Sequence, residues 1–320
     1  MPKLLEVRDL CVEFDTDEGP VRAADHVSFF LEEGETFGLA GESGCGKSVT
    51  SMSIPRLVPT PPGRIVSGEI LFMGRDLLRL PAEELRKIRG SLIGVIFQEP
   101  MTALSPLQRI GDQIAEVILL HRPMTRRDAL RMAADWLARV GIGEPERIMR
   151  EYPFELSGGM RQRVMIAMAL VLKPRLIIAD EPTTALDVTI QAQILELMRN
   201  VKGEESSMLL ITHDMGVIWE ICSRMAVMYA SRIVECGPVR ELFRNPRHPY
   251  TKGLMESIPA LHPDAKRLPG IPGQVPSLRK LPDGCAFAPR CPSAGPKCRT
   301  ENPPMHTDGD HGVACFYSRN

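Results

Sequence analysis

The residues with the clearest chemical pattern form one short segment. Residues 41–48 are Gly-Glu-Ser-Gly-Cys-Gly-Lys-Ser and match G-x-x-x-x-G-K-[ST] without a mismatch. Three glycines let the backbone pass close to a polyphosphate, and the N–H groups that follow can point at its oxygens. Lys47 would reach the β- and γ-phosphates, and the hydroxyl of Ser48 would bind Mg²⁺. The segment therefore predicts a phosphate site that works with Mg²⁺.

Polar residues follow two predicted strands. The strand over 92–97 ends at Gln98, and the strand over 175–179 ends at Asp180 and Glu181. Because open α/β sheets bind ligands beyond the carboxyl ends of their strands, we expect these side chains around the phosphate site. Asp180 would organise Mg²⁺ through water, and Glu181 would polarise the water that attacks the γ-phosphate.

Two further signals are weaker on their own. The predicted strand over 207–212 ends at His213, and a lone histidine there is usually a surface residue. Ser157 precedes Gly158 and Gly159 at a predicted helix start, where serine can act as the N-cap and glycines allow close approach of a phosphate. An ordinary turn has the same composition. Both signals become informative because they follow the glycine-rich segment in the chain and lie close to the other predicted strand ends.

The cysteines divide into two groups. Four are scattered, and four crowd near the C-terminus: Cys11, Cys45, Cys222 and Cys236, then Cys285, Cys291, Cys298 and Cys315. In a reducing compartment, crowding indicates metal ligation before disulfides. The C-x₅-C, C-x₆-C and C-x₁₆-C gaps are wider than the tight pairs usual at zinc sites and suit a larger group. On spacing, an iron-sulfur cluster, zinc and unligated cysteines all remain open.

One scattered cysteine lies inside the glycine-rich segment. Cys45 is at a predicted helix start with Lys47 close by, and this environment favours the thiolate. We therefore expect alkylation of Cys45 to block nucleotide binding. The alternative is that the position tolerates any small residue.

Strands and helices must position these groups. Residues 4–14 and 27–31 predict a β-hairpin, and Phe14 near its tip could either stack on a nucleobase or pack on the core. A strand over 35–40 and a helix over 47–54 flank the glycine-rich segment.

A helical region follows the predicted strand that ends at Gln98. Between residues 101 and 152, apolar residues recur at helical spacing and predict one buried helix face: Leu130, Ala133, Ala134, Leu137 and Val140. We interpret this region as a helical insertion between core strands.

Composition excludes some classes of protein. The chain has 320 residues and a formal net charge of −1, so it lacks the basic surplus that nucleic-acid binding favours. No N-terminal signal pattern and no apolar run of membrane-spanning length is evident. We therefore expect a cytosolic protein without a nucleic-acid partner.

The order of the motifs resembles that of the ATP-binding-cassette (ABC) ATPases over about residues 4–240. The motifs are residues 41–48, Gln98, residues 156–159, Asp180 with Glu181, residues 185–187 and His213. The resemblance implies that two cassettes face head to tail, with each ATP between one chain's residues 41–48 and the other's residues 157–159. The implied roles are ATP binding by Gly41, Glu42, Ser43, Gly44, Cys45, Gly46, Lys47, Ser48 and Val49; Mg²⁺ binding by Ser48, Gln98 and Asp180; catalysis by Glu181, His213 and Gln98; contact with the partner's ATP by Ser157, Gly158 and Gly159; a D-loop at Asp187; and adenine stacking by Phe14.

A closer resemblance is to the ATPases of dipeptide and oligopeptide importers. It rests on residues 98–106, 245–252, 271–278 and 284–292, and it covers the whole chain. It implies that the cysteine-rich C-terminal region carries an iron-sulfur site, so we expect a 4Fe-4S cluster on Cys285, Cys291, Cys298 and Cys315, with zinc as the alternative.

The expected fold is an α/β P-loop NTPase core with an antiparallel β-subdomain, a helical insertion and a small cysteine-rich C-terminal extension. The nucleotide-binding domain would span 1–240, with its helical subdomain at about 101–157, and the extension would span 241–320.

The resemblance implies an ATP-hydrolysing importer subunit, peripheral on the cytoplasmic face of the inner membrane. Its implied partners are two permease subunits, a second ABC ATPase and, indirectly, an extracytoplasmic solute-binding protein. The alternatives are a motor for nickel, glutathione or an opine-like solute, and a soluble ABC ATPase outside transport.

Overall fold

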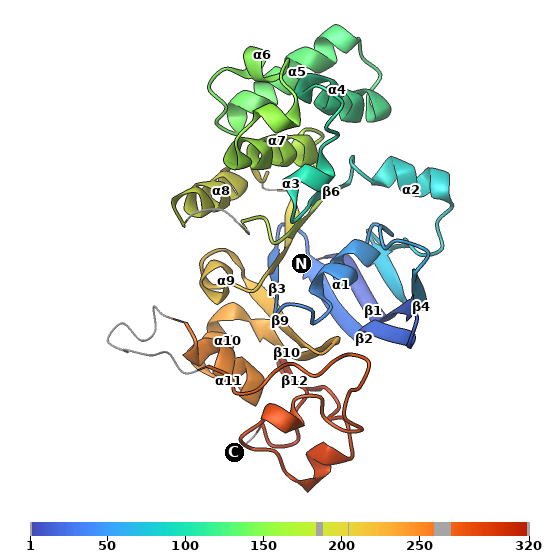
Figure 1. The fold of residues 1–320 in the computed structure, drawn as a ribbon, viewed down its shortest axis with the longest axis vertical. Coiled ribbons are helices and arrows are strands. Elements are labelled where there is room, and N and C mark those ends of the chain that lie inside the picture. Colours follow the sequence, from blue (N-terminus) through green and yellow to red (C-terminus); the bar gives the residue numbers. More distant parts are fainter. Residues whose placement is uncertain (1, 184–187, 204, 259–269, 319–320) are drawn as a thin grey trace. The chain divides into compact units, whose positions relative to one another are not determined.

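The computed structural model of the chain describes residues 2–183, 188–203, 205–258 and 270–318 (Figure 1). It divides into two compact units. Unit 1 joins residues 1–79 to residues 210–320, and unit 2 consists of residues 80–209. Strand β8 (Ser207–Thr212) runs across the boundary between them.

The N-terminal part of unit 1 is an antiparallel sheet with strand order β2-β1-β4-β5. Its strands are β1 (Lys3–Thr16), β2 (Gly19–Glu32), β4 (Gly63–Phe72) and β5 (Arg75–Asp76). The predicted hairpin is confirmed as β1 and β2, with Leu10 opposite Val27. Strand β4 pairs with β1 as far as Gly63, which lies opposite Phe14.

A second sheet in unit 1 contains strands β11-β12-β10-β9-β3 in that order. Its strands are β3 (Thr36–Ala40), β9 (Arg224–Tyr229), β10 (Arg232–Pro238), β11 (His306–Asp308) and β12 (His311–Val313). Strands β3 and β9 are parallel, and the other pairs are antiparallel. All of β3 after Thr36 is buried, so the strand that leads into the glycine-rich segment is fixed by packing on both faces.

The helices of unit 1 are short. They are α1 (Lys47–Ser53), α9 (Met215–Ile221), α10 (Val239–Arg244), α11 (Pro249–Glu256) and the 3₁₀ turns η3 (Ala288–Arg290) and η4 (Pro296–Arg299). Helix α1 confirms the helix predicted over 47–54, and Pro55 follows where the helical hydrogen bonds stop.

Unit 2 is largely helical around the parallel pair β6 (Ile93–Ile96) and β7 (Leu176–Asp180). Its helices are α2 (Ala82–Ile88), α3 (Pro100–Ala103), α4 (Ile110–His121), α5 (Arg126–Arg139), α6 (Pro145–Ile148), η1 (Pro153–Glu155), α7 (Gly158–Leu170) and α8 (Val188–Val201). Helices α4, α5 and α7 pack on one another (Figure 1).

The predicted helical insertion is confirmed, with one adjustment to its buried face. On α5 the side chains that pack inward are Ala129, Ala133, Trp136 and Leu137, while Leu130 and Ala134 are half-buried. The buried face of α5 is therefore rotated slightly from the predicted one, because the large Trp136 occupies the core. Among the described residues, no helix is both long and apolar enough to span a membrane.

Candidate functional site

The glycine-rich segment connects β3 to α1, in the order that the sequence predicts. Gly41, Gly44 and Gly46 have φ angles of +148°, +78° and +100°, which residues with a Cβ rarely adopt. A Cβ at Gly46 would collide with the carbonyl oxygen of Ala23. One at Gly41 would collide with the carbonyl oxygen of Met228. Gly41 and Gly46 are therefore needed for two reasons: their positive φ angles and the close approach of a neighbouring backbone carbonyl.

Lys47 is folded back onto this segment. Its side chain is buried, and Nζ donates hydrogen bonds to the carbonyl oxygens of Gly41 at 2.8 Å and Glu42 at 3.1 Å. A phosphate oxygen is a charged and therefore stronger acceptor than a carbonyl oxygen. The ammonium of Lys47 is thus placed where it can release these two carbonyl oxygens and bind a phosphate oxygen instead.

The environment of the Cys45 thiol does not favour the thiolate, contrary to the expectation. Its thiol is fully buried, and this burial raises the pKa above its usual value, although the charge of Lys47 acts in the opposite direction. Sequence proximity to Lys47 indicated a thiolate, but desolvation of the charged form dominates. Cys45 is therefore a packing residue of the loop.

In unit 2 the carboxyl ends of β6 and β7 lie at the same edge, because the two strands are parallel. Asp180, the last residue of β7, is buried. Glu181 follows with a φ of +44°, and its Oε2 accepts a hydrogen bond from Nε2 of Gln98 at 3.2 Å. A non-glycine residue at positive φ is strained, and such strain gathers at functional sites. The structure thus brings together the polar residues predicted at these two strand ends.

Ser157 is the N-cap of α7, as predicted. Its hydroxyl accepts a hydrogen bond from the backbone N–H of Met160 at 3.4 Å. Gly158 and Gly159 form the first turn, and a Cβ at Gly158 would meet open space. Gln162, one turn later, is buried and donates to the carbonyl oxygen of Pro182. That contact ties α7 to the chain that follows Glu181.

The other predicted site residues that the structure describes lie in unit 1. His213 is exposed after β8 in unit 1, and the adjacent Asp214 is the N-cap of α9. Phe14 is half-buried on β1. Ser48 and Val49 lie in the first turn of α1. Asp187 lies outside the described residues.

Two segments of the chain match known families. Residues 24–184, about half of the chain, match the family described as ABC transporter. The chain belongs to the ABC transporter family. Residues 234–298 match the C-terminal region of oligopeptide/dipeptide transporters, which begins close to the expected extension.

Similar proteins within the ABC transporter family extend over nearly the whole chain. One is y4tR of Sinorhizobium fredii, named a probable peptide ABC transporter ATP-binding protein, which is 51% identical over 98% of this chain and 95% of its own length. Another is AppD of Bacillus subtilis, named an oligopeptide transport ATP-binding protein, which is 49% identical over 99% of this chain and 97% of its own.

A solved structure supports the ABC ATPase fold. The dimeric ATP-binding cassette MJ0796, bound to ADP and Pi, aligns with a TM-score of 0.66 at 27% identity. The alignment covers 74% of this chain and 99% of that chain. The α/β P-loop core expected from the sequence is therefore confirmed.

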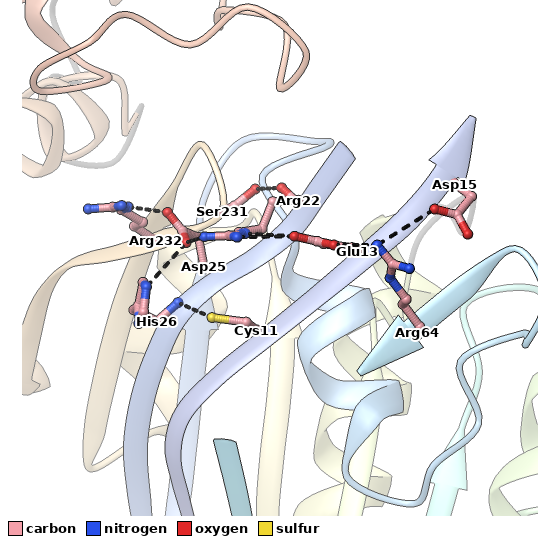
Figure 2. Close-up of polar contacts among 9 residues, drawn as sticks. All are labelled: Cys11, Glu13, Asp15, Arg22, Asp25, His26, Arg64, Ser231 and Arg232. Atoms are coloured by element: carbon pink, nitrogen blue, oxygen red, sulfur yellow. Dashed lines mark hydrogen bonds and ion pairs between the residues drawn. The ribbon is translucent and has the colours of Figure 1, made fainter. Parts of the chain in front are cut away.

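Three side chains of the β-subdomain form a group that could attract a metal ion. Ligand atoms of Cys11, Asp25 and His26 lie within 4.8 Å of one another (Figure 2). Asp25, however, accepts hydrogen bonds from Arg22 at 2.8 Å and from Arg232 at 2.5 Å. Burial acts to raise the pKa of Asp25, but these guanidinium groups lower it below its usual value.

Two guanidinium groups on one carboxylate oppose a cation. The same Arg22 also pairs with Glu13, and Glu13 pairs with Arg64 (Figure 2). We therefore interpret this part of the ABC ATPase as an ion-pair network that joins β1, β2, β4 and β10.

The four C-terminal cysteines lie in loops and short turns of unit 1. Cys298 is buried, and the other three are half-buried. Burial raises the pKa of Cys285, Cys291 and Cys315, and the charge of Cys298 acts on each of them in the same direction. The backbone N–H of Cys285 donates to the carbonyl oxygen of Cys298 at 2.9 Å. The backbone of Cys285 therefore lies directly beside that of Cys298.

Sequence reasoning missed two residues that contact the glycine-rich segment. Arg290 donates through Nη1 to Oε2 of Glu42 at 2.8 Å and through Nη2 to Oε1 at 3.1 Å. The backbone N–H of Glu42 donates to the hydroxyl oxygen of Tyr250 at 2.9 Å. More than 200 residues separate each pair, so no local pattern could signal these contacts.

Proposed function

We propose that this ABC ATPase is the ATP-hydrolysing subunit of an importer for di- and oligopeptides. The observation that supports this best is that one chain matches both the ABC transporter family and the C-terminal region of oligopeptide/dipeptide transporters. A nucleotide-binding cassette is common to transporters of many solutes, whereas the second match concerns peptides. The names of the relatives point to the same solute class.

The subunit would couple ATP binding and hydrolysis to uptake through two separate permease subunits. A second ABC ATPase would complete the motor, and dimeric structures of MJ0796 support such pairing. Binding of two ATPs would close the cassettes, and hydrolysis would reopen them. The pair would sit peripherally on the cytoplasmic face of the inner membrane, and a solute-binding protein would deliver peptide from the other side.

The reaction is in-line attack of water on the γ-phosphorus, which breaks the bond to the β–γ bridging oxygen and releases ADP and phosphate. Positioning and charge stabilisation are its chief aids. Glu181 would act as base, and the hydrogen bond from Gln98 supports this role because it orients the carboxylate. Lys47 would bind the phosphates. Asp180 would organise Mg²⁺ together with Ser48 and Gln98.

The other roles follow the same family pattern. His213 would hold the γ-phosphate, and Phe14 would stack on adenine. Residues 157–159 would bind the ATP of the partner cassette, and their exposed or half-buried position at the start of α7 is compatible with this. Asp187 would form the D-loop.

Reconstitution with the permeases tests the function. Proteoliposomes that contain the full transporter should take up labelled di- or oligopeptides only when ATP is present on the side of the bilayer where the ATPase subunits lie. Glutathione, Ni²⁺ and an opine serve as competing solutes. Uptake of one of these, with no uptake of peptide, would contradict the proposed solute.

The thiols of Cys285, Cys291, Cys298 and Cys315 would hold a 4Fe-4S cluster. Four cysteines within residues 285–315 offer the thiolate donors that such clusters use, and metal binding would release the thiol protons. Zinc would fit the same donor set. The bound group would link loops that have little regular structure, so its contribution would be structural.

Metal analysis distinguishes these occupants. Chain purified without oxygen should contain about four irons and matching sulfide, whereas zinc at about one per chain would replace the cluster assignment. Cys298→Ser should lose the metal and loosen the extension but retain ATP binding. Absence of both metals would leave the thiols unligated and contradict the proposal.

A further inference from the structure

Glu42, the second residue of the glycine-rich segment, is held at three points. Its carboxylate accepts two hydrogen bonds from Arg290, and its N–H donates to Tyr250. Its carbonyl oxygen accepts a hydrogen bond from Nζ of Lys47. One residue therefore links Arg290 of the C-terminal extension to the ammonium that is proposed to bind phosphate.

Arg290 is itself fixed by its surroundings. Only 4% of its side chain is exposed, and Nε donates to the carbonyl oxygen of Pro272 at 2.9 Å. Its guanidinium lies 5.8 Å from the ring centre of Tyr229, which packs edge to face on Phe287 at 5.2 Å. A planar guanidinium that is already positioned loses little conformational freedom when it binds a carboxylate with two hydrogen bonds. The contact to Glu42 is thus a rigid one.

Charge gives the contact a second consequence. A carboxylate on a loop that binds a polyphosphate repels the ligand, and the repulsion is strong where water is partly excluded. The side chain of Glu42 is about two-thirds covered, since 32% of it is exposed. Arg290 neutralises this carboxylate. Without the guanidinium, the loop would carry an uncompensated negative charge.

We propose that Arg290 is a positioning residue of the ATP site, which fixes and neutralises Glu42 so that the affinity for Mg-ATP depends on the C-terminal extension. The inference rests on the proposed role of residues 41–48 as the phosphate site. It assigns the extension a part in nucleotide binding.

Isothermal titration of the full chain with Mg-ATP tests the proposal. Arg290→Met keeps much of the apolar stem and removes the charge, and we expect the Kd to rise about tenfold, the size of one charged hydrogen-bonded contact. Arg279→Met is the matched control. Arg279 also lies in the extension and pairs with Glu18 of the β1–β2 turn at 2.6 Å, so its replacement should leave the Kd unchanged.

A double-mutant cycle shows whether Arg290 acts through Glu42. In a Glu42→Gln background, Arg290→Met should change the Kd less than about threefold, because the carboxylate partner is gone. An equal change in both backgrounds would overturn the proposal, since Arg290 would then act through folding of the extension alone. A wild-type Kd for Arg290→Met would overturn it as well.

Lys47→Ala separates this inference from the proposed function. If Lys47→Ala binds Mg-ATP as tightly as the wild type, the phosphate site itself is misassigned. If it loses binding while Arg290→Met does not, only the role of Arg290 fails. Urea unfolding checks each variant. Should Arg290→Met not fold, Arg290→Gln takes its place in the cycle under the same criteria, because the glutamine side chain is uncharged and cannot neutralise the carboxylate.

Discussion

Gln98 donates a hydrogen bond from Nε2 to Oε2 of Glu181, with 3.2 Å between the two atoms. The two residues are 83 positions apart and meet because β6 and β7 are parallel and end at the same edge. The contact fixes the carboxylate of Glu181 from one side.

Glu181→Gln should abolish most ATP hydrolysis and keep ATP binding. An amide cannot accept the proton of the attacking water, so we expect turnover of the assembled transporter to fall on the order of 10²-fold or more. Glu196→Gln, on the exposed face of α8, is the control and should hydrolyse ATP normally. Near-normal turnover of Glu181→Gln would show that another group is the base.

Two glycines of the glycine-rich segment should respond differently to alanine. Gly44→Ala places a Cβ at positive φ but in open space, and it should cost about 1 to 2 kcal/mol in the free energy of unfolding. Gly46→Ala adds a collision with the carbonyl of Ala23, and it should cost a further 1 to 3 kcal/mol, roughly. Urea denaturation of both variants measures the difference. Equal losses would contradict the close approach seen at Gly46.

Cys45 should be slow to alkylate in the folded chain. Its burial raises the pKa and blocks the reagent, so iodoacetamide should label it at least about tenfold more slowly than in urea-unfolded chain. Peptide-resolved mass spectrometry reads the labelling. Cys45→Ser should bind ATP normally. Fast labelling of the folded chain would restore the reactive-thiol hypothesis.

The buried His248 should make stability depend on pH. Burial lowers its pKa from 6.5 to about 4, although the charge of Glu235 acts to raise it. Between pH 6.5 and pH 4 the unfolded chain binds one proton more than the folded chain. The stabilisation that the buried, neutral imidazole contributes is therefore complete above pH 6.5 and is lost as the pH falls towards 4. The loss amounts to about 3 kcal/mol in the free energy of unfolding.

His248→Asn provides the control for this prediction. The Nδ1 of His248 accepts a hydrogen bond from the N–H of Tyr250 as the N-cap of α11, and asparagine can replace that acceptor. The variant should keep the cap and lose the slope between pH 6.5 and 4. Urea unfolding at several pH values measures both. An unchanged slope would assign it to another group, such as Glu235, for which burial acts to raise the pKa but hydrogen bonds lower it below its usual value.

The sequence predicts features that local pattern determines. The hairpin at β1 and β2, the cap at Ser157 and the strand that ends at Asp180 each follow from residue types within a few positions. The same holds for the glycines of residues 41–48, whose positive φ angles the pattern requires.

Features that depend on tertiary packing could not be predicted in this way. The pKa of Cys45 is set by surrounding side chains rather than by its neighbour Lys47. The contact between Arg290 and Glu42 joins residues 248 positions apart. In both cases the deciding quantity, burial or distance, exists only in the folded chain.

Strand β12 closes an edge that would otherwise be open. It pairs with β10 at Glu235 and Cys236, and β11 then ends the sheet with three exposed residues, 306–308. A short polar strand is a poor template for another chain. If translation stopped before residue 306, β10 would present unpaired N–H and C=O groups to solvent. Residues 306–313 therefore cover an edge of β10 that would otherwise be open to strand addition.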